Sequence, residues 1–208
     1  MACSVVCVSH ETGSGGDEVG KRVAEQLGYL HVDEDIVARA AAQGGLEPGD
    51  IADEERRKSF ASRFLEAMAE GGGDAWMMGA GVSAAMESVR PADVRALIRE
   101  TVEQTAARGN VVIVAHAASH ALEPGPRTLR VLVTASPTTR EQRVGAAEGL
   151  DETKAARIIK DSDAGRRDYL KRFYSMDGES PTDYDVVVNT DHLSAEQAAE
   201  IVLRAADR

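Results

Sequence analysis

Residues 3–27 have the sequence CSVVCVSHETGSGGDEVGKRVAEQL, and this stretch decides the fold. An apolar run leads into a polar, glycine-rich turn, HETGSGGD. The residues after the turn favour a helix, because apolar side chains recur every four positions at Val19, Val23 and Leu27. A strand, a glycine loop and a helix in this order present backbone N–H groups and a helix N-terminus to a phosphate. The stretch therefore predicts a phosphate-binding turn, with an ordinary structural turn as the alternative.

The turn can be aligned with the P-loop pattern GxxxxGK[ST] in two registers. In the first register, His10 replaces the first glycine, Gly16 replaces the lysine, and Asp17 replaces the hydroxyl residue that binds Mg²⁺. In the second register, the GK at residues 20–21 supplies the lysine, but it then lies more than one turn inside the expected helix. We favour the first register. A Rossmann dinucleotide site is excluded, because the turn contains no GxGxxG.

The remainder of the chain alternates short apolar runs with longer amphipathic stretches. Strands are predicted at residues 29–33, 110–115, 128–134 and 184–189. Helices are predicted at residues 33–42, 56–70, 91–108, 137–148, 151–174 and 193–206, the last with Ser194 as its N-cap. Strands that alternate with helices indicate βαβ units. We therefore expect an α/β fold with about five parallel strands, helices on both faces, and a ligand at the carboxyl ends of the strands.

Length, charge and cysteine content limit the class of protein. The 208 residues correspond to a single domain, and the net charge of −11 argues against a nucleic-acid partner. A small anionic ligand stays open, because a few clustered arginines can hold one. No signal peptide or membrane span is visible. Cys3 and Cys7 lie ~13 Å apart along an extended strand, too far for a disulfide. We therefore expect a cytoplasmic protein with two buried, reduced cysteines and no membrane partner.

Four motifs occur in a fixed order along the chain. They are SHETGSGG at residues 9–16, GYLHVD at 28–33, NVVIVAHA at 110–117 and YDVVVNT at 184–190, with an arginine-rich segment between the last two. Over nearly the whole chain this order resembles the cytidylate kinase-like family of P-loop proteins, whose members carry SRExGSGG, GYxxxD, NxVIVGRG and YDxVxNT. The resemblance implies a three-layer P-loop NTPase-type fold over residues 1–208, with a helical lid at residues 140–174.

The resemblance also implies a reaction and the residues that serve it. The reaction is an ATP-dependent phosphoryl transfer to CMP or another small phosphorylated acceptor, with Mg²⁺ as the metal. The N–H groups that would hold the donor phosphates belong to Gly13, Ser14, Gly15, Gly16 and Asp17, and Asp17 would also contact the metal. The implied acceptor-side residues are His10, Asp33 and His116. The implied catalytic residues, which would close over the transferring phosphoryl group, are Arg140, Arg143, Arg157 and Arg166.

Each of these side chains has an ordinary structural role as an alternative. His10 is equally well explained as a surface turn residue, Asp33 as the N-cap of the next helix, and His116 as part of a helix cap. The lid arginines beyond residue 150 lie where basic and acidic residues alternate at i+3 and i+4, as they do on any solvated helix. Arg140 and Arg143 have stronger support, because they follow a predicted strand by one loop and share a helix face.

Two functions therefore stay open. The first, which we favour, is a cytidylate kinase-like phosphotransferase with a degenerate P-loop. The second is a catalytically inactive pseudokinase that binds a nucleotide or another ligand and acts as a sensor or partner-binding protein. It is favoured by His10 and His116, which replace two arginines of the family motifs with groups that titrate near neutrality. Restoration of activity by Gly16→Lys together with His116→Arg would support it. The sequence leaves a monomer and a homodimer both open.

Overall fold

The computed structural model describes residues 3–33, 99–100, 102–114 and 118–207 of the chain. The helices predicted at residues 33–42 and 56–70 lie outside the described residues except for Asp33, and His116 lies outside them too. Of the helix predicted at residues 91–108, residues 99–100 and 102–108 are described, and all of these but residue 108 are helical. Among the described residues, no helix combines the length and the apolar character that crossing a membrane requires.

The described strands form one five-stranded sheet with the order β2-β3-β1-β4-β5, and all of its pairings are parallel. The strands are β1 (Val5–His10), β2 (Leu30–Val32), β3 (Val111–Val114), β4 (Thr128–Thr134) and β5 (Val186–Asn189). The predicted five-stranded parallel sheet is confirmed. Strand β1 is central, with Val5 opposite Val111 on one side and Thr128 on the other. The loop that follows β1 is therefore at the middle of the carboxyl edge of the sheet.

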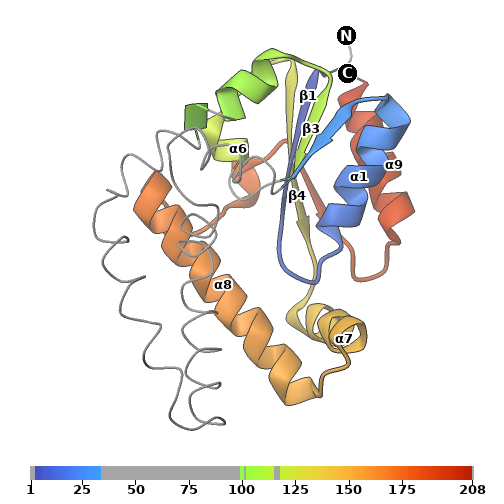
Figure 1. Cartoon of the computed structure of the whole chain (residues 1–208), viewed down its shortest axis with the longest axis vertical. Helices are drawn as coiled ribbons and strands as arrows, with labels where there is room; N and C mark the ends of the chain where they lie inside the picture. The colour runs from blue at the N-terminus through green and yellow to red at the C-terminus, as the bar shows by residue number, and fades with distance from the viewer. Residues whose placement is uncertain (1–2, 34–98, 101, 115–117, 208) are drawn as a thin grey trace, which may run out of the picture.

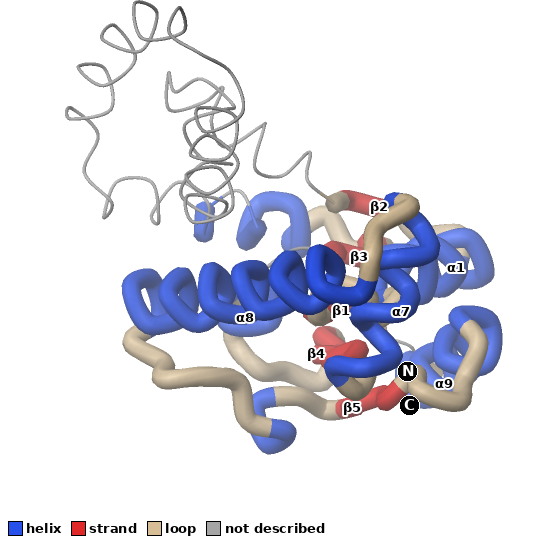
Figure 2. The backbone as a smooth tube through the Cα atoms, turned by 90° about the horizontal axis from the view of Figure 1, so that it is seen from below, coloured by secondary structure: helices blue, strands red, loops and turns tan. Residues whose placement is uncertain are grey.

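Helices cover both faces of this sheet, as the alternation of elements predicted. The described helices include α1 (Gly16–Leu27), α6 (Ala118–Ala121), α7 (Pro137–Glu148), α8 (Glu152–Tyr174), the short 3₁₀ helix η2 (Pro181–Asp183) and α9 (Ala195–Ala206). Helices α1 and α9 pack side by side on one face, and α6 lies on the other (Figure 1). Figure 2 shows α8 on the side of the strand row opposite α1 and α9, next to α7.

The core forms where the continuous apolar run of β1, buried on both faces, meets these helices. Val6 and Val8 are fully buried in a cluster that also takes in side chains from β3, β4, α1 and α9. Cys3 and Cys7 are buried free thiols, as expected from the sequence, and burial raises the pKa of Cys7 to about 12, against a smaller opposing effect of the Arg130 charge. Ser194 caps α9 by accepting from the Gln197 amide, which confirms the predicted cap.

Candidate functional site

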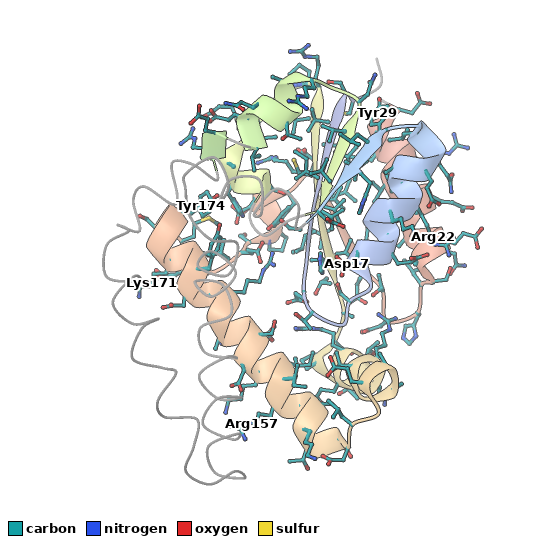
Figure 3. The ribbon with its side chains drawn as sticks, in the orientation of Figure 1. Asp17, Arg22, Tyr29, Arg157, Lys171 and Tyr174 are labelled. Carbon is teal, nitrogen blue, oxygen red and sulfur yellow. The ribbon has the colours of Figure 1, made fainter. Side chains whose placement is uncertain are left out.

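The glycine-rich turn connects the end of β1 at His10 to the start of α1 at Gly16. Gly13 and Gly15 have φ values of 80° and 82°, which only glycine adopts without strain. The predicted helix start is confirmed, because α1 begins at Gly16; Lys21 therefore lies inside the helix with its side chain exposed, which is the ground on which the first register is favoured. Figure 3 shows Asp17 at the end of α1 that lies nearest to α7 and α8.

The start of α1 presents the N-terminal backbone amides of a helix. The first hydrogen bond of the helical ladder runs from the Val19 amide to the Gly15 carbonyl, and the amides before it point out of the N-terminus. The Ser14 amide is different, because it donates to the Glu11 carbonyl at 3.0 Å and closes the turn. The Ser14 hydroxyl is buried and has no hydrogen-bond partner among the described residues.

Arg140 and Arg143, at the start of α7, bind the carbonyl groups of this turn. Arg140 is 2% exposed, and its Nε donates to the Thr12 carbonyl at 2.7 Å. Arg143 donates to the carbonyls of Gly13 and Ser14, at 3.3 Å each. In a trans peptide the N–H group points opposite to the carbonyl. The amides of Gly13 and Gly15 therefore point away from the two arginines.

Further contacts fix both guanidinium groups in place. The Arg140 guanidinium forms a bidentate ion pair with Asp163 of α8, at 2.5 and 3.2 Å, and lies 3.6 Å from a Glu11 carboxylate oxygen. The Arg143 guanidinium donates to the hydroxyl and the carbonyl of Thr190, at 2.9 and 2.6 Å. In this structure both arginines bind protein atoms and hold the turn in shape.

The two candidate arginines on α8, Arg157 and Arg166, differ from each other. Arg166 is 11% exposed; it binds Glu179 and donates to the carbonyl of His10 at 2.8 Å. Arg157 is 58% exposed and pairs with Asp161 one turn further along α8, at 3.8 Å. Figure 3 shows Arg157 far from Asp17, which marks the start of α1. The structure thus brings Arg140, Arg143 and Arg166 to the glycine turn, and it places Arg157 on a solvated stretch of helix.

His10 and Gly16 are in direct contact across the turn. A Cβ atom built on Gly16 would lie 2.1 Å from the Cβ of His10, closer than real Cβ contacts permit. The His10 ring lies beside Asp17, with Nε2 and the carboxylate 3.0 Å apart. Gly16→Lys is therefore a poor way to supply a P-loop lysine, because the side chain of His10 fills the space that the new side chain requires.

Asp33 directly follows β2 and is the last residue of the described range 3–33; its side chain is half exposed. Its carboxylate lies 3.8 Å from Nδ1 of His31. Strand β3 separates β2 from β1, so Asp33 is at the correct edge of the sheet but two strands away from the strand that carries the glycine turn.

Sequence reasoning missed the acidic partners of the arginines. Asp163 and Glu179 bind Arg140 and Arg166, and Glu11 lies beside Arg140 and accepts from the Thr134 hydroxyl. One signal was available in the sequence, because Asp163 and Arg166 lie three residues apart and therefore on one face of α8. Their targets, 23 and 13 residues away in the chain, carry no such signal.

Replacement of Gly13 by alanine is expected to destabilise the protein more than replacement of a described glycine that has a left-handed backbone outside the turn. A Cβ atom at Gly13 would lie 2.8 Å from the backbone oxygen of Arg140. Overpacking therefore adds to the left-handed strain, for a total of about 3 kcal/mol. Gly149 is the matched control, because its φ is 67° and nothing lies within 4 Å of its Cβ position. Gly149→Ala should cost about 1 kcal/mol. Urea unfolding measures the free energy of unfolding of both variants, and equal decreases would contradict the close approach of Gly13 to Arg140.

Comparison with known proteins agrees with this geometry. The sequence model of the cytidylate kinase-like family matches residues 5–192. A cytidylate kinase of Archaeoglobus fulgidus is 25% identical over 208 aligned residues, which cover 97% of this chain and 94% of the relative.

Solved structures share the fold at lower identity. An uncharacterised protein from Eubacterium ventriosum superposes with a TM-score of 0.68 at 16% identity, covering 98% of both chains. A sugar kinase from Janibacter gives 0.55 at 16% identity, covering 99% of this chain and 95% of the other. A shikimate kinase from Bacteroides thetaiotaomicron gives 0.51 at 14% identity, covering 98% of both. With the family match over most of its length and this P-loop kinase-like fold, the chain belongs to the cytidylate kinase-like family.

Proposed function

We propose that this protein is an ATP-dependent phosphotransferase that acts on CMP or another small phosphorylated acceptor. The observation that carries the proposal is the glycine turn, whose carbonyl groups are bound by Arg140 and Arg143 on one side. The N–H groups on the other side, together with the N-terminus of α1, form an anion site of the kind that binds phosphates. Family membership supports a nucleotide as the ligand of this site.

In this proposal the donor phosphates are held by backbone amides rather than by a lysine. The amides of Gly13, Gly15, Gly16 and Asp17 are the donors, because that of Ser14 closes the turn. Arg140, Arg143 and Arg166 act as positioning residues that keep these amides in place. Phosphoryl transfer depends mainly on such positioning and on charge stabilisation, so a rigid turn contributes directly to the rate. Arg157, which the resemblance implies as a catalytic residue, is largely exposed on α8 and lies far from Asp17, so its contact with a transferring phosphoryl group stays a prediction.

The residues at the start of α1 fit Mg²⁺ as the metal that accompanies ATP. Mg²⁺ binds oxygen ligands, keeps several water molecules, and needs only one or two carboxylates when phosphates supply the others. The carboxylate of Asp17 is 80% exposed beside the anion site, and the described residues contain no cluster of three ligating side chains that would form a metal cage. Mg²⁺ would neutralise charge on the phosphates. Asp33 and His116 are proposed to contact the acceptor, and His10 is proposed to contact a phosphate.

A second candidate function, binding without catalysis, is favoured by one observation. The arginines that reach the turn bind Asp163, Glu179 and backbone carbonyls, while the side chains at the mouth of the turn are His10 and Asp17. An anion site that depends on amides and a histidine can hold a nucleotide without accelerating phosphoryl transfer. The protein would then be a sensor or a partner-binding member of the family.

A coupled assay of ATP consumption distinguishes these functions. The panel should hold the nucleoside monophosphates and small phosphorylated acceptors, each with Mg²⁺, and ATP-induced thermal shifts should be measured in parallel. We expect a thermal shift with Mg²⁺ and ATP, and turnover with at least one acceptor. A thermal shift without turnover on any acceptor would favour the binding protein. Neither a shift nor turnover would overturn the proposed function.

Asp17→Asn is expected to change nucleotide affinity in opposite directions with and without the metal. Without Mg²⁺, ATP should bind about fivefold more tightly, because removal of a like charge near the phosphates is worth about 1 kcal/mol at a solvated site. With Mg²⁺, the metal concentration at half-maximal turnover should rise about tenfold, because a carboxylate ligand is lost. Isothermal titration and Mg²⁺ titration of the rate measure the two effects.

Glu18→Gln is the matched control for this experiment. It removes the same charge one residue further along, from a side chain that pairs with Arg22. It should leave the Mg²⁺ requirement unchanged. If Asp17→Asn and Glu18→Gln behave alike, Asp17 is not the metal ligand.

A further inference from the structure

Glu179 lies in the segment between α8 and η2, and it is one of the most heavily bonded carboxylates at the carboxyl edge of the sheet. Its two oxygens accept from Nε and a terminal nitrogen of Arg166, at 2.5 and 2.8 Å, and both side chains are only 11% exposed. The hydroxyl of Tyr184 donates to the same carboxylate, and Nε2 of His120 lies 3.9 Å from it. Residues from three separate parts of the chain thus converge on one carboxylate.

The protonation states of this cluster follow from its contacts. Burial alone raises the pKa of Glu179, but the nearby His120 ring, the hydrogen bonds and charge of Arg166, and the Tyr184 hydroxyl together hold it well below its ordinary value. Burial and the neighbouring carboxylate raise the pKa of Tyr184. Burial lowers the pKa of Arg166, but the bond to Glu179 outweighs this effect and the net change is upward. Glu179 is therefore a buried anion, Arg166 its cation and Tyr184 a neutral donor.

The ion pair with Glu179 uses two of the three guanidinium nitrogens of Arg166, and the third nitrogen binds the residue that precedes the glycine turn. With two nitrogens bound to Glu179, the third donates to the carbonyl of His10 at 2.8 Å. His10 is the last residue of β1, immediately before the turn. Arg166 can only make this bond while its planar guanidinium is held in the orientation that Glu179 imposes.

Two other residues of α8 bind the same turn within one helical turn of Arg166. The hydroxyl of Ser162 lies 2.6 Å from the hydroxyl of Thr12, and Asp163 binds Arg140, which in turn binds the Thr12 carbonyl. Helix α8 therefore contacts the turn at three adjacent points. Of these, only the Arg166 contact depends on a residue outside α7 and α8.

We propose that Glu179 is a positioning residue for the phosphate donor, which acts through Arg166 on the junction between β1 and the glycine turn. This inference rests on the proposed function, because it assigns Glu179 a role at the same anion site. Without the carboxylate, Arg166 loses its fixed orientation and the His10 carbonyl loses its donor. The amides of the turn are then no longer held at the separation that the phosphates require. The effect should fall on nucleotide binding, since Glu179 itself contacts no phosphate.

The test compares Glu179→Gln with a variant that breaks a similar ion pair elsewhere. Asp185, the residue before β5, pairs with Arg130 of β4 at 3.2 Å, also accepts from the Arg130 amide, and is partly buried. Asp185→Asn is therefore the control for a general loss of stability. Affinity for Mg²⁺ and ADP is measured by calorimetry, KM and kcat by the coupled assay, and amide hydrogen exchange of residues 11–17 on the protein without nucleotide.

Glu179→Gln should weaken nucleotide binding about tenfold and raise the KM for ATP by a similar factor, because small displacements of positioning groups have effects of this size. It should also speed amide exchange of residues 11–17, whereas Asp185→Asn changes neither property. Arg166→Met combined with Glu179→Gln should weaken nucleotide binding no more than either substitution does alone. Tyr184→Phe removes one donor to Glu179 and leaves the ion pair, so it should give a smaller effect in the same direction, and it replaces Glu179→Gln if that variant does not fold.

The outcomes separate this inference from the proposed function. If the wild type binds nucleotide and Glu179→Gln binds it equally well, the inference is wrong and the function stands. Equal losses of nucleotide affinity in Glu179→Gln and Asp185→Asn would also overturn the inference, since both losses would then reflect lower stability alone. If the wild type binds no nucleotide, the proposed function fails, and amide exchange alone decides whether Glu179 orders the turn.

Discussion

Arg140→Met is expected to lower the free energy of unfolding by about 3–5 kcal/mol, the cost of breaking a buried ion pair by removal of one partner. The Arg140 side chain is 2% exposed and pairs with Asp163, whose side chain is 27% exposed. Removal of the guanidinium leaves the Asp163 carboxylate without its cation, removes the Arg140 charge from beside Glu11, and leaves the Thr12 carbonyl without its donor. Methionine fills most of the vacated volume, so the loss reports on charge and hydrogen bonding rather than on a cavity.

A double variant and an exposed control identify the cause of this loss. Arg140→Met with Asp163→Leu should recover part of the stability, because the orphaned carboxylate is removed as well. Arg157→Met breaks a largely exposed pair with Asp161 on the same α8 helix and should change stability by less than about 0.5 kcal/mol. Urea unfolding measures all three variants. A small loss in Arg140→Met, or no recovery in the double variant, would contradict the buried pair as the element that holds the turn.

Gly16→Lys is expected to disrupt the glycine turn rather than to repair it. The new Cβ atom would meet the Cβ and Cγ atoms of His10 at 2.1 and 2.5 Å, and these atoms lie too close to the β1 backbone to move easily. The overpacking should cost about 3 kcal/mol of stability and weaken nucleotide binding. Urea unfolding and calorimetry with Mg²⁺ and ADP measure the two effects.

His10 and Gly16 have the large and the small residue in the opposite order from the P-loop pattern. In that pattern a glycine stands at the position of His10 and a lysine at the position of Gly16. His10→Gly combined with Gly16→Lys should therefore be more stable than Gly16→Lys alone, and it should bind ATP at least as tightly as the wild type. Additive losses in the double variant would show that the two positions do not compete for one space.

The sequence predicted the elements well where local signals were strong. Strand β4 and helix α7 have the predicted bounds, because an alternating apolar run defines the first, and the Ser136 cap followed by Pro137 defines the start of the second. Helix α8 begins one residue later than predicted, since Asp151 is its N-cap rather than its first residue. Strand β5 is shorter than predicted at its N-terminal end, where Tyr184 instead follows η2 and turns its hydroxyl to Glu179.

The roles of the charged residues were harder to predict, because they depend on contacts between distant parts of the chain. The sequence set Arg140 apart from the later arginines because it follows a strand by one loop, but it gave no sign that Arg140 is buried in an ion pair with Asp163 of α8; that contact depends on the position of α8 against the turn. The competition between His10 and Gly16 is likewise a matter of packing, six residues apart in the chain and in contact across the loop. Sequence motifs identified the turn, and three-dimensional contacts identified what holds it.

The most direct test of a phosphate site built from backbone amides is a crystal structure of the protein with Mg²⁺ and ADP. We expect phosphate oxygens about 3 Å from the amides of Gly13, Gly15, Gly16 and Asp17, at the N-terminus of α1. Arg140 and Arg143 should keep their contacts to the turn carbonyls in that complex. A nucleotide bound elsewhere, or an empty glycine turn at saturating nucleotide, would contradict the account.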